Sequence, residues 1–290
     1  MPIDRTHYEA SNASRGTKHR ARPLRRRVFA DAWLSNQPGA WSLALAPPLS
    51  AFVIFGFTPL RLLACLTWAS GYSFIFAGAQ WLSRHFRRQF LPASCFWGAL
   101  TAILGTMLVI AAPGVLLWTP AFAVLMLVYA GCAWRRQTMS LGAEVVAVIA
   151  ASSMAVLIAT ISNPSMQAVP GASDVSVSLD SLDSLALPTS PSVMVFGMAW
   201  LLQELGAILH VRAMLRRRRR AVMKRVSLIW HVLMVLLSLR YALLEFTAML
   251  LLARAAVMPN VPVRLRVRTV GMIEMACTLL TCVSLVLTFR

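Results

Sequence analysis

The chain has 290 residues, of which 58% are apolar and only 13% are charged. A soluble domain carries about a quarter charged residues and cannot hide this much apolar surface, so a soluble globular protein is excluded. The net charge of +18 would suit a nucleic-acid partner. However, the basic residues are clustered between apolar runs, as topology signals are in membrane proteins. We therefore expect the lipid bilayer, and no nucleic acid, as the partner.

Residues 1–33 are polar and carry eight Lys and Arg. They lack the apolar content to pack, and no short apolar run with a small-residue cleavage site follows them, so a secretory signal is not expected. We interpret them as a disordered basic arm in the cytoplasm. An arm of this kind beside a membrane is attracted to anionic lipid headgroups.

Apolar runs of the length needed to cross a bilayer follow the arm. A spanning helix needs about 20 predominantly apolar residues, and backbone groups in lipid must be satisfied within the segment. The length of the runs and their lack of alternation exclude a β-barrel. The sequence therefore predicts an all-α fold, a polytopic transmembrane helical bundle within residues 34–290. The clear candidates for spans are 41–59, 62–82, 93–112, 114–134, 141–162, 192–212 and 270–289.

The stretch 223–258 can be one long helix or two short ones that meet near Arg240. Two helices give nine spans, with 25 Lys and Arg on the cytoplasmic side and only Arg61, Arg240 and Arg290 outside. One helix gives eight spans and leaves Arg240 in mid-bilayer at considerable cost. We prefer nine helices, although each short one would have only about 17 residues, the lower limit for a span. Eight helices remain the alternative.

The loop 163–191 is the one long segment placed outside. It has no Lys or Arg, three Asp, and many Ser and Pro. This composition is typical of a solvated loop that does not pack on the bundle. We expect it to be external and dispensable for folding.

Several polar residues fall in or next to the spans on the cytoplasmic side. Intramembrane carboxylates are costly and are functional candidates by default. A rise of 1.5 Å per residue places residues from four helices at similar depth in that half of the bilayer. The alternative is that they only hydrogen-bond between helices. The candidate ligand-binding residues are Asn36, Gln37, Trp41, Glu204, His210, His231 and Glu274.

Other sequence features suggest no chemistry. There is no P-loop, no GxGxxG, HExxH or GxSxG motif, and no Cys/His cluster with zinc spacing, so no metal or cofactor is expected. Two proline sites, Pro47-Pro48 and Pro120, are expected to interrupt the first and fourth helices. Arg240 and Glu245 are expected to pair near the outer surface.

Two short motifs carry a resemblance. Residues 35–41, Ser-Asn-Gln-Pro-Gly-Ala-Trp, follow Arg27 and open the first helix, and residues 268–274 open the last. They resemble the PNQHGAW signature and the basic-x-x-Gly-x-x-Glu entry of the YwiC-like family of bacterial membrane proteins, and His231 also fits. Pro38 stands where the family has His, and Ser35 where it has Pro. The resemblance implies a helical bundle in the cytoplasmic membrane over residues 27–290, and no particular reaction.

Three functions remain open on the sequence. The first is a non-enzymatic membrane protein that binds or moves a small or lipidic ligand through a polar cavity on the cytoplasmic side. The second is a prenyl or lipid transferase, since the helix layout loosely resembles transferases of the UbiA type, but their Asp-rich metal motifs are missing. The third is a structural partner in a membrane complex. The clustering of polar groups favours the first.

Overall fold

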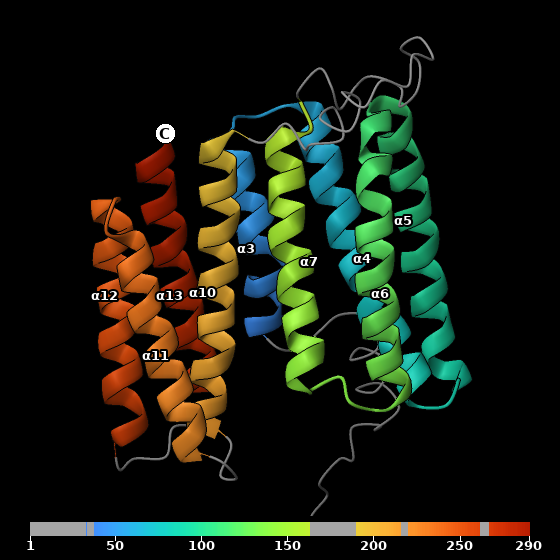
Figure 1. The fold of residues 1–290 in the computed structure, drawn as a ribbon. Helices are drawn as coiled ribbons and strands as arrows, with labels where there is room; N and C mark the ends of the chain where they lie inside the picture. The colour runs from blue at the N-terminus through green and yellow to red at the C-terminus, as the bar shows by residue number, and fades with distance from the viewer. Residues whose placement is uncertain (1–32, 34–37, 163–189, 216–219, 262–266) are drawn as a thin grey trace, which may run out of the picture.

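The computed structural model describes residues 33, 38–162, 190–215, 220–261 and 267–290 (Figure 1). Within these parts the chain forms nine α-helices and no strand, which confirms the predicted all-α bundle. Eight of these helical segments are long and apolar enough to cross a membrane, and α3, with 17 residues, is the shorter apolar one. The helices are α3 (Pro38–Ile54), α4 (Pro59–Ser83), α5 (Leu91–Ala111), α6 (Thr119–Trp134), α7 (Leu141–Thr160), α10 (Pro191–Leu215), α11 (Arg220–Ser238), α12 (Ala242–Val257) and α13 (Val267–Phe289). Nearly all of the arm and of the 163–191 loop lies outside the described residues.

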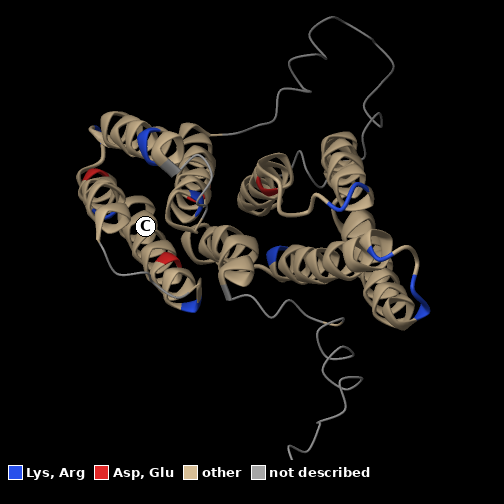
Figure 2. Cartoon of the chain, turned by 90° about the horizontal axis from the view of Figure 1, so that it is seen from below, with Lys and Arg blue, Asp and Glu red and all other residues tan. Residues whose placement is uncertain are grey.

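The helices run up and down and form two groups joined by α3 and α7 (Figures 1 and 2). On one side α10, α11, α12 and α13 contact one another in turn, and α13 contacts α10, which closes a ring of four. On the other side α4 packs on α5 and α6. Between them α3 packs on α7 and α13, and α7 packs on α10. The buried core gathers here, around Ile158, Phe196 and Trp200.

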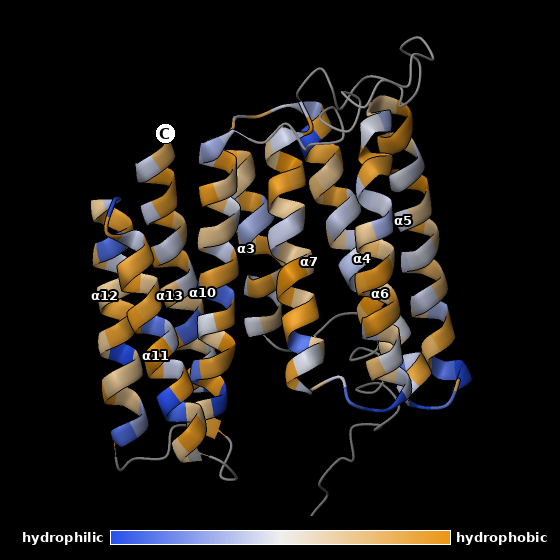
Figure 3. Ribbon diagram, in the orientation of Figure 1, coloured by the Kyte–Doolittle hydropathy of each residue, from blue (hydrophilic) through white to orange (hydrophobic). Residues whose placement is uncertain are grey.

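Basic residues of the described chain gather at the lower end of Figure 1. The α4–α5 and α6–α7 connections there are hydrophilic in Figure 3. We call this end the basic end; among its residues are Arg84, Arg87, Arg88, Arg135 and Arg136. The α11–α12 turn and the C-terminus lie at the opposite end.

The stretch 223–258 forms two helices, as the charge count predicted. Helix α11 ends at Ser238, α12 begins at Ala242, and the Tyr241 amide closes the turn on the Ser238 carbonyl at 2.8 Å. Helix α11 has 19 residues, and a 3-10 turn, η3 (Met258–Asn260), extends α12. Arg240 lies exposed in the turn. The prediction of an ion pair between Arg240 and Glu245 is wrong, because the ion pairs of the described residues involve other side chains.

The prolines affect the helices less than expected. Helix α3 continues through Pro47 and Pro48, so the predicted interruption there is wrong. Pro48 cannot donate to the Ala44 carbonyl four residues earlier, and the Trp68 indole of α4 donates to that carbonyl instead, at 2.7 Å. Pro120 lies in the first turn of α6, after the 3-10 segment η2 (Pro113–Trp118), where the missing N–H has no helical partner to lose.

Arg61 links the ends of α3 and α7 at the end of the bundle opposite the basic end. Its side chain is 8% exposed and donates to the carbonyls of Phe55 and Gly56, where the chain leaves α3. It also donates to Ile158 and Ala159, in the last turn of α7, at 3.1 and 3.2 Å. A cation is favoured at helix C-termini, where carbonyls lack helical donors. This single side chain therefore caps two helices.

Candidate functional site

A cluster of polar side chains lies inside the ring of α10 to α13, in the half near the basic end. Hydrophilic residues colour the lower parts of these helices in Figure 3. Gln203, Glu204 and His210 come from α10, and His231 comes from α11, and each is at most 2% exposed. Gln203 and His210 are seven residues apart and share one face of α10. We call these four, together with Arg254 of α12 and Glu274 of α13, the polar cluster.

Gly206 allows α10 and α11 to approach closely at the cluster. A Cβ at this position would lie 3.2 Å from the Met234 sulfur and 3.4 Å from Nε2 of His231. Nearby, the Trp230 indole of α11 donates to the Leu202 carbonyl of α10 at 2.9 Å. The small residue and the indole together hold His231 against α10.

An ion pair and a histidine pair set the geometry of the cluster. Arg254 Nη1 lies 2.7 Å from Glu274 Oε2, and both side chains are 8% exposed. His210 Nε2 is 3.8 Å from the other carboxylate oxygen of Glu274, beyond hydrogen-bond distance. The rings of His210 and His231 have centroids 6.4 Å apart. Glu204 is close enough to Glu274 for the two carboxyls to interact electrostatically.

Several buried atoms of the cluster have no protein hydrogen-bond partner. His231 Nδ1 donates to the Ser227 carbonyl at 2.7 Å, so Nε2 is left as the acceptor of the neutral ring. That Nε2 is unpartnered, as are both ring nitrogens of His210, Oε1 of Glu204 and Nε2 of Gln203. Buried polar groups are nearly always hydrogen-bonded. The cluster thus offers donors and acceptors to a further molecule or to a proton.

An apolar cavity of about 200 Å³ adjoins the cluster inside the same ring. Leu244, Ala248 and Leu251 of α12 are among the residues that line it, and Tyr241 lies at its far end. Gln203 belongs to its wall, so the amide with the free Nε2 joins the cavity to the cluster. The cavity therefore extends from the cluster toward the Ser238–Tyr241 turn and away from the basic end. The sequence predicts a polar cavity on the cytoplasmic side, whereas this cavity is mostly apolar.

The described part of the first motif, residues 38–41, begins α3, where Trp41 packs edge-on against Tyr72 of α4 with ring centroids 5.3 Å apart. A model of the family described as YwiC-like protein matches residues 34–159, which include this motif. This part of the chain is similar to the YwiC-like family. No curated protein and no solved structure matched the chain.

The YwiC-like part extends from α3 to the last turn of α7. The polar cluster and its cavity lie on α10 to α13, beyond the matched residues. The motif of residues 268–274 and His231, which also suggested the family, are therefore not covered by the match. Any function of the cluster is therefore inferred from the geometry of this chain alone.

Four of the predicted site residues come together, namely Glu204, His210, His231 and Glu274. In the YwiC-like part, Trp41 packs on Tyr72 of α4. Asn36 and Gln37 lie outside the described residues.

The sequence analysis missed two members of the site, Arg254 and Gln203. Arg254 was counted only as a topological charge, although it lies within the apolar helix α12 and not in the loop that follows. Gln203 was not among the candidate residues. A charged residue flanked by apolar residues on both sides is the signal that could have revealed Arg254.

A second ion pair joins α10 to the YwiC-like part. Arg212 Nη2 lies 2.6 Å from Oε2 of Glu144 in the first turn of α7, and Arg212 also donates to the Met139 carbonyl at 3.0 Å. This pair ties the ring of four to α7 at the basic end.

Proposed function

We propose that this integral membrane protein binds an amphiphilic ligand, small or lipidic, inside the ring of α10 to α13. The apolar cavity would take the hydrocarbon part of the ligand, and the polar cluster would take its polar part. One observation carries the proposal, the unpartnered Nε2 of Gln203, buried to 2% exposure where the cavity meets the cluster. Burying an amide without a partner costs about 1–3 kcal/mol, so a chain that keeps it there gains from a ligand acceptor.

The shape of the site supports a slender ligand. Pockets for drug-sized molecules have volumes of about 300–1,000 Å³, whereas this cavity has about 200 Å³. Its wall is mostly aliphatic, and its hydroxyl side chains are Ser238, Tyr241, Thr247 and Thr281. A single alkyl or isoprenoid chain with an oxygen-bearing head fits this description. The head would accept from Gln203 and could donate to Nε2 of His231 or to Glu204.

A purely structural role is the second candidate, and the Arg254–Glu274 pair favours it. Polar side chains often tie helices together in membranes, and this ion pair joins α12 to α13. Such a role explains paired groups but leaves Gln203, Glu204 and His231 unexplained, because these have buried atoms without a protein partner. Ligand binding accounts for these unpartnered atoms.

The orientation is also part of the proposal. We place the basic end and the arm of residues 1–33 in the cytoplasm and the loop 163–191 outside, because loops rich in Lys and Arg stay inside. Anionic headgroups of the inner leaflet would then face the basic loops. The alternating directions of the nine helices put Arg290 outside. A reporter fused after Arg290 is expected to be external, and a cytoplasmic signal would reverse the assignment.

Native mass spectrometry of the protein released from detergent micelles tests ligand binding. The wild-type protein is expected to retain an amphiphile of defined mass. Gln203→Leu removes the amide and Ala248→Leu fills the cavity, and both should lower the retained fraction. Gln137→Leu, a matched change at an exposed glutamine of the α6–α7 connection, should leave it unchanged. A folded wild-type protein with no adduct, or equal adducts in all variants, would contradict the proposal.

A further inference from the structure

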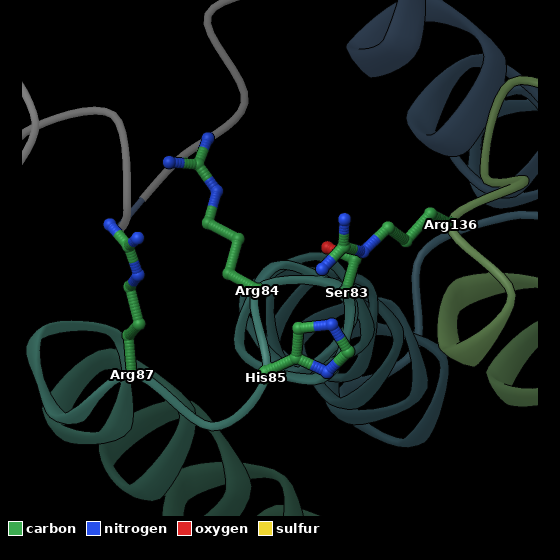
Figure 4. Close-up of a pocket in the computed structure, with 5 residues that line it drawn as sticks. All are labelled: Ser83, Arg84, His85, Arg87 and Arg136. Carbon is green, nitrogen blue, oxygen red and sulfur yellow. The ribbon is translucent and has the colours of Figure 1, made fainter.

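A second cavity lies at the basic end, far along the chain from the polar cluster. It is open, has a volume of about 490 Å³, and is lined by Ser83, Arg84, His85, Arg87 and Arg136. Figure 4 shows Arg84, His85 and Arg87 on the α4–α5 connection and Arg136 reaching toward them from the α6–α7 connection. We call it the arginine pocket. Two loops that are separate in the sequence thus bring three guanidinium groups around one space.

In both loops, a non-glycine residue takes the left-handed conformation that usually ends a helix at glycine. At the end of α4 the Phe86 amide donates to the Trp81 carbonyl at 2.9 Å, and at the end of α6 the Gln137 amide donates to Cys132 at 2.7 Å. This is the Schellman ending, whose next residue after the cap takes a left-handed conformation and is usually Gly. Here those residues are His85 (φ 54°) and Arg136 (φ 57°).

His85 and Arg136 line the arginine pocket, whereas Phe86, which follows His85 and is also left-handed (φ 59°), does not. A left-handed conformation costs a non-glycine residue about 1–2 kcal/mol. Strain of this kind is concentrated at functional sites. The cost of placing His and Arg where Gly is favoured is offset if their side chains hold a ligand. Attraction to the helix C-terminus alone explains this less well, because the Schellman bonds already satisfy carbonyls of that turn.

The arginines of the pocket have no acidic partner within the described parts of the chain. The ion pairs formed there use Arg212, Arg254 and His210. Arg84 instead lies over the Phe90 ring, 4.7 Å from its centroid, which leaves its N–H edges free to donate. Three cations held together repel one another, and an anion placed between them relieves that repulsion. A guanidinium group matches a phosphate in shape, with two parallel hydrogen bonds.

Aromatic side chains around the pocket indicate the level at which it lies. The Phe86 ring packs between Trp81 and Trp134, with centroid distances of 4.7 and 5.8 Å. Trp134 is 60% exposed and Phe86 is 44% exposed. Tryptophan with an exposed apolar ring is favoured at the membrane–water interface, at the depth of the lipid headgroups. The pocket therefore opens where lipid phosphates lie.

We infer that the arginine pocket binds the phosphate group of an anionic phospholipid and that Arg84, Arg87 and Arg136 donate hydrogen bonds to this phosphate. The inference deepens the proposed contact between basic loops and anionic headgroups, and it rests on that part of the proposed function. It adds a defined site and a chemical class. It does not depend on the ligand of the α10–α13 ring.

Lipid titrations followed by native mass spectrometry test the inference on the full chain. The probes are dioleoyl phosphatidic acid, dioleoyl phosphatidylglycerol and dioleoyl phosphatidylcholine. The anionic lipids are expected to bind more tightly than phosphatidylcholine. Arg136→Gln and Arg84→Gln should each weaken the tightest anionic-lipid site by about tenfold, as expected for loss of a charge-assisted hydrogen bond.

The neighbouring Arg135 is the matched control, because it is exposed, carries the same charge and does not line the pocket. Arg135→Gln should leave the tightest site within about twofold, well under the tenfold loss of one such bond. Equal weakening by Arg135→Gln would overturn the pocket but leave the general attraction to anionic lipid. No preference for anionic lipid would overturn both.

Glycerol 3-phosphate supplies the soluble form of the same chemistry, and full displacement of the lipid by it would overturn the lipid assignment. Gln203→Leu should have no effect here, which separates this site from the ligand of the ring.

Discussion

Arg254 of α12 and Glu274 of α13 form an ion pair of 2.7 Å in which each side chain is only 8% exposed. The two charges lie within helices that are apolar on either side, so neither can reach water readily. Removing both charges from water is costly, and their mutual attraction offsets that cost only while both are present. The pair therefore links α12 and α13 in a way that a single substitution should reveal.

The first prediction is that single substitutions in this pair are worse than the double one. Arg254→Met or Glu274→Gln leaves a buried charge without its partner, which costs about 3–5 kcal/mol. The double variant has no buried charge left, so it should regain most of the loss. Thermal unfolding in a mild detergent, followed by tryptophan fluorescence, measures this. Arg268→Met, at an exposed position of α13, is the control and should have little effect. Losses that simply add in the double variant would show that the two groups do not interact.

The second prediction concerns the contact of α10 with α7. A Cβ on Gly197 would lie 2.4 Å from a methyl group of Val156, closer than real Cβ contacts. Valine has little rotamer freedom in a helix, so it cannot turn away easily. Gly197→Ala should therefore destabilise the protein by about 1–3 kcal/mol, the usual cost of overpacking. The thermal midpoint in detergent is the measurement.

A second substitution can test the cause of that loss. Val156→Ala removes the clashing methyl group, so Gly197→Ala should cost much less in its presence. Gly131→Ala on α6 is the control, since a Cβ there meets nothing within 4 Å and Ala favours a helix over Gly. A loss at Gly197 that persists unchanged in the Val156→Ala background would mean that the helix contact is not responsible.

Much of this fold follows from counting along the chain. The apolar runs give the helices, because each must satisfy its own backbone in lipid. The uneven distribution of Lys and Arg between the two sides predicted two helices within 223–258, and the structure has two helices there. Depth at 1.5 Å per residue brought Glu204, His210, His231 and Glu274 to one level. Those four residues are indeed neighbours.

Counting along the chain cannot say which helices are lateral neighbours. The closed ring of α10 to α13 depends on side-chain packing between helices, so the sequence did not reveal the cavity within it or the place of Gln203 on its wall. The same limit applies to arginines, since a charge count assigns a side of the membrane and says nothing of burial. Arg61 and Arg254 were both counted as solvent-facing charges, and both are buried side chains with partners.

The third prediction follows from the burial of Arg61. Its guanidinium donates to carbonyls at the ends of α3 and α7 and is 8% exposed. Arg61→Met should destabilise the protein by about 3 kcal/mol or more, because the carbonyls of Ile158 and Ala159, in buried contacts, and those of Phe55 and Gly56 lose a charged donor at once. Arg240→Met removes an exposed arginine at the same end and is expected to change the thermal midpoint little. Similar midpoints for the two variants would show that Arg61 is not a cap.

The last prediction tests how α3 keeps its helix through two prolines. Pro48 has no N–H for the Ala44 carbonyl, and the Trp68 indole donates to it at 2.7 Å. Trp68→Phe keeps a ring but removes the donor, so it should cost about 1–3 kcal/mol for a buried carbonyl left unsatisfied. In a Pro48→Ala background the new backbone N–H can donate to Ala44 as in any α-helix. Trp68→Phe should then cost clearly less, and a double-mutant cycle of thermal midpoints measures the difference. An equal cost in both backgrounds would mean that Trp68 contributes through ring packing alone, against α3 and against Phe122 of α6.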